Sequence, residues 1–247
     1  MARQPLTYCG QAVRDYDCDR FLLSLTAPPA LRGALWALFA FNHEIARTRE
    51  VVTETQLGLI RLQWWRDNID AIYKGGEPFG NPALGDLAAA IRAYDLPQAD
   101  FEALLYAREF DLEGVTPSGM TGLENYADFT TTPLHRMALK VLNQTVEERM
   151  LRDLSAGYAM IGILRAIPFY EAQGRQYLPD GVGVEEVTMR AEALLDAGAG
   201  RKGFIGAASY LGRCYAGQIR KRRFNVRDAR LGRSPIPFIL KAFSGKF

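Results

Sequence analysis

Arg165 is the charged residue whose position most suggests chemistry, because it lies on the apolar face of a predicted helix. Leu154, Tyr158, Ile161 and Arg165 recur at the three- and four-residue spacing that places side chains on one helical face. A guanidinium keeps its charge when it is buried, so Arg165 needs acidic partners, backbone carbonyls or an anionic ligand. The helix, predicted over about 145–173, should therefore form the wall of a cavity or hold a satisfied ion pair.

Small residues surround Arg165 on the same helix. They are Gly157, Ala159, Gly162 and Ala166, and they leave room for a close neighbouring helix or for a ligand. Both interpretations remain open. Pro168 lacks an amide donor and crowds the preceding turn, which predicts a kink or a thinner helix near Ile167. Any chemistry should lie near this break.

A pair of carboxylates near the N-terminus gives a weak metal signal. The spacing of Asp15 and Asp19 would place both side chains on one helical face. Arg14 and Arg20 stand beside them, and this mixture favours a surface ion-pair patch over a metal site.

The two histidines give no metal signal. His43 and Glu50 are too few to make a site, and the pattern favours a satisfied polar end to a core helix. His135 has no second His or Cys at ligand spacing, so we expect a structural role for it as well.

Helices must position all of these residues, because no long segment alternates with the two-residue period of a strand. The predicted fold class is all-α. Thr53, Thr121 and Thr145 each begin a capping-box pattern at a predicted helix start, and Pro133 predicts a bend or a split. The predicted helices cover residues 8–25, 28–50, 53–73, 82–94, 97–112, 121–143, 145–173, 183–197, 203–222 and 237–243.

Size and composition indicate an ordinary globular protein. With 247 residues, 48% of them hydrophobic, the chain can bury the core of one domain or of two small ones. The longest apolar run, 33–41, is far short of the ~20 residues that a membrane span needs. The N-terminal sequence MARQPLTYCG lacks the features of a signal peptide, and the three cysteines contain no CxxC pair. We therefore expect free thiols and a cytoplasmic protein.

The C-terminal segment is strongly basic. Residues 201–247 contain 12 Lys and Arg and the single acid Asp228, a net charge of +11, whereas the preceding residues sum to −9. Such a segment suits an acidic protein partner, anionic lipid or nucleic acid, although a solvated helix face is the simpler interpretation. Tyr215 and Phe224 are the only aromatic residues flanking the cluster, so a nucleic-acid partner is not expected.

Three segments in order resemble the squalene and phytoene synthase family. They are LRGALWALFAFNHEIA, LQWW and GRQYLP, and the resemblance extends from about Tyr8 to Cys214. It implies a single domain over 1–247, a helical bundle of the isoprenoid synthase type with a central cavity. It also implies the substrate-binding candidates, which are Phe39, His43, Arg47, Arg165, Arg175 and Tyr177.

The resemblance fails at the family's metal motifs. Enzymes of the family join two prenyl diphosphates with magnesium held by two aspartate-rich motifs on facing helices. By register, the first motif falls on Ala46, Arg47 and Glu50, and the second falls on Gly162, Ala166 and Tyr170. One glutamate cannot assemble a cluster of hard cations, and an arginine would repel them. We therefore expect a non-catalytic member of the family, a pseudoenzyme without a metal cofactor.

The chain is also similar to an aspartate-lacking branch of the family, the mitochondrial assembly factor of respiratory complex I. The segments AFNHEIA, LENYADFTTTPL and GILRAIPFYEAQGRQYLP carry this likeness, and the lack of a transit peptide suits a bacterial relative. The likeness implies complex I subunits or assembly intermediates as partners, and a prenyl lipid or prenyl diphosphate as a candidate occupant of the cavity. The basic segment could add peripheral contact with the inner membrane.

Two other functions stay open. The chain could be a prenyltransferase in isoprenoid biosynthesis, using Mg²⁺ at an altered site with the carboxylates Glu44, Glu50 and Glu54. It could instead be a peripheral lipid-binding protein whose basic segment is attracted to anionic headgroups.

Overall fold

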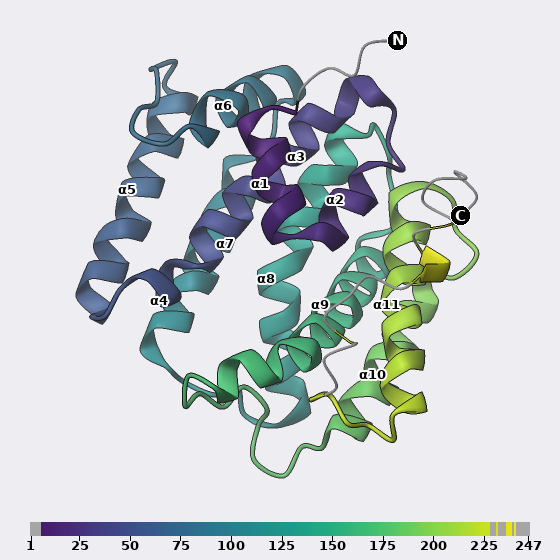
Figure 1. Cartoon of the computed structure of the whole chain (residues 1–247). Helices are drawn as coiled ribbons and strands as arrows, with labels where there is room; N and C mark the ends of the chain where they lie inside the picture. Colours follow the sequence, from purple (N-terminus) through teal and green to yellow (C-terminus); the bar gives the residue numbers. More distant parts are fainter. Residues whose placement is uncertain (1–5, 228–230, 232–235, 239, 241–247) are drawn as a thin grey trace. The chain divides into compact units, whose positions relative to one another are not determined.

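A computed structural model describes residues 6–227, 231, 236–238 and 240 of the chain (Figure 1). In this part of the chain all the regular elements are helices, so the all-α prediction is confirmed. Within the same residues, no helix has both the length and the apolar character needed to cross a bilayer. The elements are α1 (Tyr8–Tyr16), α2 (Cys18–Ser24), α3 (Pro29–Ala46), α4 (Thr48–Val51), α5 (Thr55–Tyr73), α6 (Ala83–Tyr94), α7 (Gln98–Glu113), α8 (Gly119–Val141), α9 (Glu148–Glu171), α10 (Val184–Leu195), η1 (Asp196–Gly198) and α11 (Gly203–Lys221).

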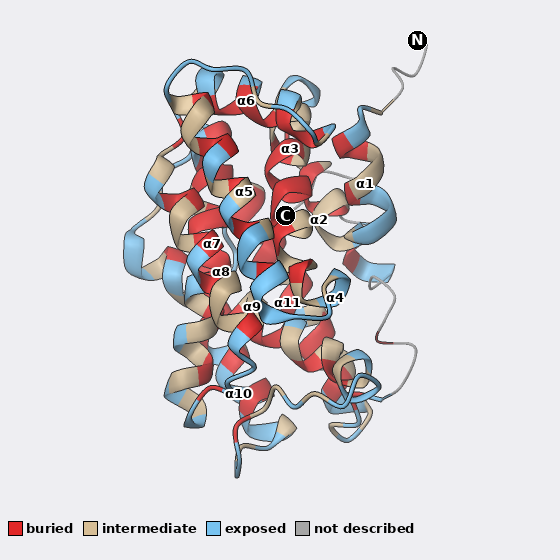
Figure 2. Ribbon diagram, turned by 90° about the vertical axis from the view of Figure 1, so that its left-hand side faces the viewer, coloured by how far each residue is buried: buried red, intermediate tan, exposed pale blue. Residues whose placement is uncertain are grey.

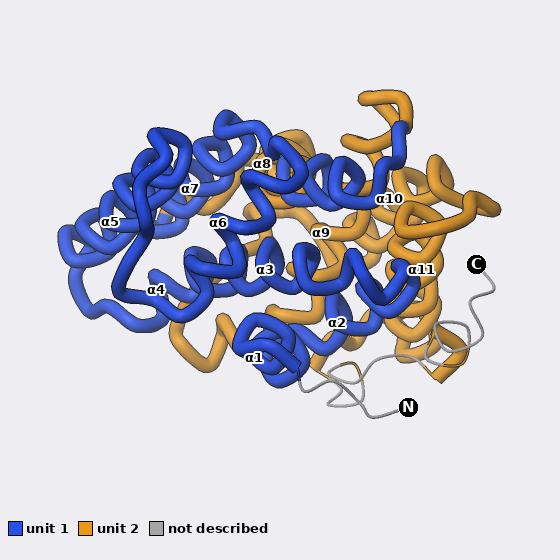
Figure 3. The backbone as a smooth tube through the Cα atoms, turned by 90° about the horizontal axis from the view of Figure 1, so that it is seen from above, with its two compact units in different colours: residues 1–114, 133–145 blue, residues 115–132, 146–247 orange. Residues whose placement is uncertain are grey.

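The chain divides into two compact units, shown in different colours in Figure 3. Unit 1 comprises residues 1–114 and 133–145, and unit 2 comprises residues 115–132 and 146–247. The division falls inside α8, between Thr132 and Pro133. The single domain with a central cavity stays a prediction.

Helix α3 is the centre of unit 1. Most of its residues from Leu35 to Ile45 are buried, as the colouring of Figure 2 shows for this helix. The Phe41 ring packs edge-on against Trp65 of α5 and Phe101 of α7, with centroid distances of 5.4 and 5.3 Å. A helix that is apolar on more than one side is expected to be central, and α3 confirms this.

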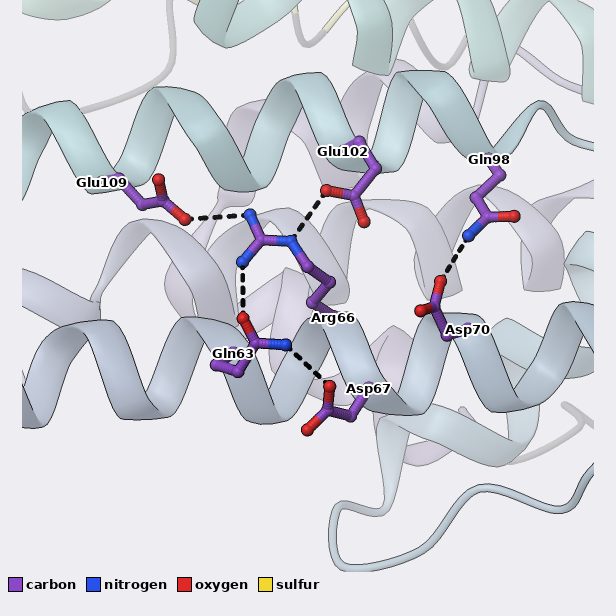
Figure 4. Close-up of polar contacts among 7 residues, drawn as sticks. All are labelled: Gln63, Arg66, Asp67, Asp70, Gln98, Glu102 and Glu109. Atoms are coloured by element: carbon purple, nitrogen blue, oxygen red, sulfur yellow. Dashed lines mark hydrogen bonds and ion pairs between the residues drawn. The ribbon is translucent and has the colours of Figure 1, made fainter.

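An ion-pair seam joins α5 to α7 within unit 1 (Figure 4). Arg66 on α5 donates from Nε to Glu102 Oε2 at 2.8 Å and from Nη2 to Glu109 Oε1 at 2.9 Å. Gln63, one turn earlier on α5, accepts a third bond from Arg66 Nη1 at 3.2 Å. These contacts hold Arg66 in one orientation between α5 and α7.

Unit 2 is built on close packing of α9, α10 and α11, and glycine permits it. A Cβ atom at Gly157 of α9 would lie 2.8 Å from the Ala191 carbonyl oxygen of α10. A Cβ atom at Gly212 of α11 would lie 2.7 Å from a methyl group of Leu195. Of the two interpretations of the small residues on α9, Gly157 therefore supports a close neighbouring helix.

The first predicted helix, 8–25, is wrong as one element. It is interrupted at Asp17, whose backbone leaves the helical region and whose carboxylate accepts from Arg20 N at 3.0 Å, capping α2. Asp15 and Asp19 consequently lie on different helices and do not share one face. The predicted ion-pair patch is confirmed for Asp15 with Arg14 at 3.4 Å, whereas Arg20 pairs with Asp17, which was not predicted, at 2.6 Å.

The predicted capping boxes are also wrong. Helix α5 begins at Thr55 after Glu54, and α9 begins at Glu148 after Glu147; neither N-cap side chain makes a capping bond. Helix α8 already begins at Gly119, so Thr121 lies inside it. Helix α8 continues through Pro133, so of the predicted bend or split the split does not occur, and the bend stays a prediction.

The predicted C-terminal helix is seen only in part. Residues 236–238 and 240 are helical, and the remainder of 237–243 lies outside the described residues. Cys9, Cys18 and Cys214 are free thiols, as predicted.

Candidate functional site

The first motif lies at the end of α3. Phe39, His43, Ala46 and Arg47 follow one another at helical spacing, so they share a face of α3 and its C-cap. Phe39 is fully buried, and the other three are half-buried. Glu50 follows on the short helix α4 and is exposed.

Two guanidinium groups share one carboxylate beside this motif. Glu44 Oε2 accepts from Arg61 Nη2 of α5 at 2.8 Å, and Glu44 Oε1 lies 3.6 Å from Arg47 Nη1. The cluster of Glu44, Arg47 and Arg61 therefore has a net charge of +1, which suits an anion better than a divalent cation. Arg61 was not among the predicted site residues. The pair of Glu44 with Arg47 could have been predicted from the sequence, because residues three positions apart are neighbours on a helix.

His43 is held by aromatic stacking. Its ring lies parallel to that of Tyr16, with the centroids 4.9 Å apart and the planes at 8°. Burial is the main cause that lowers the pKa of His43, so the imidazole is neutral at pH 7. Its Nε2 atom is buried and has no hydrogen-bond partner among the described residues. A neutral ring with a free nitrogen can donate to or accept from a ligand.

Arg165 on α9 finds two partners in unit 2. Its Nε donates to the Leu231 carbonyl oxygen at 2.9 Å, and its Cζ lies 3.5 Å from the centroid of the Tyr215 ring. Of the partners that the sequence analysis left open for Arg165, a backbone carbonyl is therefore present. Tyr215 was not predicted as a partner. It is almost fully buried on α11, where a cation–π contact is strongest because water is absent.

A helix C-cap brings Arg175 and Tyr177 back to the second motif. Gly174 adopts φ of 69° after α9, and Arg175 N then donates to the Tyr170 carbonyl oxygen at 2.9 Å. The Tyr170 and Tyr177 rings stack at 4.0 Å, and Arg175 Nη2 donates to the Tyr177 hydroxyl at 3.2 Å. Arg175 Cζ also lies 5.2 Å from the Tyr170 centroid. At position 170, where the family register expects an aspartate, this chain has one layer of an aromatic and cationic stack.

The remaining second-motif positions carry no ionisable group. Gly162 is exposed on α9 and a Cβ atom there would meet nothing within 4 Å; Ala166 is half-buried. The structure thus groups Phe39, His43 and Arg47 in unit 1, and it brings Arg175 and Tyr177 together in unit 2. Their joint role as a substrate site stays a prediction.

The described residues do not fit the magnesium cluster that the family implies. Glu44 is engaged by two arginines, and the Tyr170 ring stacks on Tyr177 with Arg175 Cζ 5.2 Å from its centroid. In the described ranges, no three His, Cys, Asp or Glu side chains are grouped so that they could hold a metal ion. No chemical step is therefore assigned to a metal.

Unit 2 also contains a charged cavity of about 370 Å³. Its lining includes Asp128 and Arg152, which pair at 2.6 Å, and Glu124, which accepts from Arg190 at 2.8 Å. Most of the lining residues are charged or polar, so this pocket suits a prenyl chain poorly.

The family model for squalene/phytoene synthase matches residues 13–236. The complex I assembly factor 6 of NADH dehydrogenase (ubiquinone) from Bos taurus is 30% identical over 181 residues, which cover 70% of this chain and 52% of that protein. A presqualene diphosphate synthase from Sinorhizobium fredii is 29% identical over 157 residues, covering 62% and 55%. The chain spans about half the length of the curated relatives that it matches.

Solved structures share the fold. A squalene synthase from Alicyclobacillus acidocaldarius superposes with a TM-score of 0.74 at 20% identity, covering 88% of this chain and 93% of that one. A dehydrosqualene synthase superposes with a TM-score of 0.75 at 16% identity, covering 96% and 94%. Both likenesses concern the backbone arrangement alone.

Proposed function

Because the chain belongs to the squalene/phytoene synthase family, we propose that it is a non-catalytic member that acts in the assembly of respiratory complex I. The observation that carries the proposal is that one carboxylate, Glu50, remains at the family's metal-motif positions, while Arg47 and Tyr170 at two of the others make internal contacts. The similarity to complex I assembly factor 6 from Bos taurus supports the choice of process. The partners would be complex I subunits or assembly intermediates.

Electrostatics argues against the family's ordinary reaction. Mg²⁺ is held by carboxylates and substrate phosphates, and its charge allows diphosphate to leave. At the first motif, Arg47 and Arg61 outnumber Glu44, so bringing a cation there would be repulsive. A phosphate or carboxylate could instead bind the guanidinium groups directly, with no metal between.

A prenyl lipid or prenyl diphosphate is the proposed small ligand. Arg47 and His43 would face its polar end in unit 1, because Arg47 is partly exposed and His43 Nε2 has no protein partner among the described residues. Arg165 and Arg175 are the candidate cations of unit 2, although each already contacts an aromatic ring. The ligand would serve recognition and would not be converted.

Deletion of the gene tests the proposal. We expect membranes of the deletion strain to lose most NADH:ubiquinone oxidoreductase activity while succinate oxidation is retained. The Glu50→Ala variant should complement the deletion as well as the unchanged chain does, because no catalytic carboxylate is needed. Normal complex I activity in the deletion strain would contradict the proposal.

A prenyltransferase remains the second candidate, favoured by the 29% identity to a presqualene diphosphate synthase. Its metal ligands would have to include Glu50 and Glu54, since Glu44 is paired with Arg61. Under this alternative, purified protein would form a condensed prenyl product, and Glu50→Ala would abolish its formation.

A further inference from the structure

The basic C-terminal segment of unit 2 contains cations that pair with no acid among the described residues. Arg213 pairs with Asp196 at 2.7 Å, Arg220 with Glu192 at 3.3 Å and Arg227 with Glu171 at 2.5 Å. In contrast, four exposed cations make no ion pair with any described residue: Arg201, Lys202, Lys221 and Arg223. The local surplus of charge therefore lies at the two ends of α11.

The end of α11 holds a cation in a conformation that favours glycine. Arg223 N donates to the Arg220 carbonyl oxygen at 2.9 Å, and Phe224 N donates to the Ile219 carbonyl oxygen at 3.0 Å. These two bonds form a Schellman cap, whose left-handed position is normally glycine. Here Arg223 occupies it, with φ of 52°. Its side chain is exposed and makes no ion pair with a described residue, so packing within the unit does not account for an arginine at this position.

Apolar side chains accompany these cations in the same segment. Ile236 is 71% exposed and Leu240 is 65% exposed, and their four-residue spacing in a helical turn places them on one face. Val226, Leu231 and Phe238 are buried, so these three residues pack against the protein. Two large aliphatic side chains are thus presented to solvent on a basic segment.

We propose that this segment binds the surface of an anionic phospholipid bilayer. Lys221 and Arg223 would contact the headgroups, and Ile236 and Leu240 would enter the boundary between headgroups and acyl chains. Cations together with exposed aliphatic side chains are typical of interfacial membrane binding. A nucleic acid would need stacking aromatics, yet Tyr215 is buried. An acidic peptide would use the cations and leave Ile236 and Leu240 unexplained.

Vesicle flotation of the full-length purified protein tests the proposal. We expect it to float with vesicles of phosphatidylcholine and phosphatidylglycerol, and to stay at the bottom with phosphatidylcholine alone. High salt should weaken binding, because the headgroup attraction is screened. Equal flotation with both vesicle types would overturn the proposal.

Two double variants test the named residues. Lys221→Gln with Arg223→Gln should weaken binding to the anionic vesicles about 30-fold, since each cation near the surface contributes about fivefold. Ile236→Ser with Leu240→Ser should remove the binding that persists in high salt. Circular dichroism melting should show that both variants remain folded.

A matched control distinguishes binding by these particular residues from an effect of the protein's net charge. Lys74→Gln with Arg149→Gln removes the same charge from exposed positions outside the segment, where Arg149 lies 3.9 Å from Asp153. This control should bind like the unchanged protein. An equal loss of vesicle binding in the control would overturn the proposal. The proposal would also be overturned if anionic vesicles failed to compete with an acidic peptide for the segment. The assay is independent of complex I, so its failure is distinct from failure of the proposed function.

Discussion

Arg47 and Tyr170 show how a motif position can keep its place on a helix while its charge is changed. Arg47 stays at the end of α3 and pairs with Glu44 at 3.6 Å, and Tyr170 stays on α9 and stacks with Tyr177 at 4.0 Å. Neither contact needs a metal to be satisfied. At the scale of single residues, Arg47 and Tyr170 are therefore part of the protein's own ion pairing and packing.

His135 leads to a prediction about acid stability. It is fully buried, and burial, helped by the charge of Arg20, lowers its pKa to about 3. In the unfolded chain His135 takes up a proton as pH falls below about 6.5. In the folded chain it does so only when pH falls to about 3. This one residue should therefore lower the free energy of unfolding by about 2 kcal/mol between pH 7 and pH 5.

The variant His135→Gln isolates that contribution. Urea denaturation should show that the free energy of unfolding falls less between pH 7 and pH 5 in the variant than in the unchanged protein. The paired carboxylates are the same in both proteins, so their contribution cancels in this comparison. An identical loss in the two proteins would mean that His135 takes up its proton in the folded state.

Partners of single residues were only partly predictable. The need of Arg165 for a partner follows from its place on an apolar stripe, but Leu231 lies 66 residues away in sequence and offers only a backbone carbonyl. Such an acceptor has no sequence signature. The contact of Arg61 with Glu44 depends in the same way on how α3 and α5 pack.

At the scale of elements, glycine has opposite roles at the two ends of the second motif. Gly162 lies within α9, where a Cβ atom would meet nothing within 4 Å, and Gly174 adopts φ of 69° at the C-cap. Alanine at position 162 should stabilise the protein, because glycine is a poor helix former. Alanine at position 174 should destabilise it, because a side chain is strained in the left-handed region.

The same substitution at both sites therefore makes a matched test. Gly162→Ala should raise the free energy of unfolding by about 1 kcal/mol, and Gly174→Ala should lower it by about 1 kcal/mol. Chemical denaturation measures both. Two changes of the same sign would contradict the assignment of the helix end at Gly174.

Helix existence was predictable from apolar periodicity, whereas helix ends were not. Nine of the ten predicted segments correspond to observed helices, and the tenth, 237–243, lies mostly outside the described residues. The interruptions at Asp17 and at Arg47, which separates α3 from α4, were not predicted, and the predicted starts of α5, α8 and α9 were wrong. A threonine followed three residues later by Glu or Gln satisfies the capping pattern anywhere. Tertiary packing decides whether the chain turns there or one or two residues away.

At the scale of the whole chain, the two compact units could not be read from composition. Residues 133–145 belong to unit 1 although they continue α8 directly from unit 2. No linker-like sequence marks this division, and the one signal beside it is Pro133, where a bend or a split of the helix was predicted. The charge asymmetry, in contrast, was visible in the sequence because it needs only a count of residues.

The metal-motif positions on α3 in unit 1 and on α9 in unit 2 lead to a prediction about prenyl diphosphates. Purified protein with farnesyl or geranylgeranyl diphosphate and Mg²⁺ or Mn²⁺ should release no diphosphate and form no condensed product, beside an authentic synthase that does both. A prenyl diphosphate bound directly by arginine should raise the melting temperature equally with and without Mg²⁺, because a ligand of the folded state stabilises it by mass action. Stabilisation that requires Mg²⁺, or any condensed product, would show that Glu50 and other carboxylates still hold a metal, and the prenyltransferase alternative would replace the non-catalytic one.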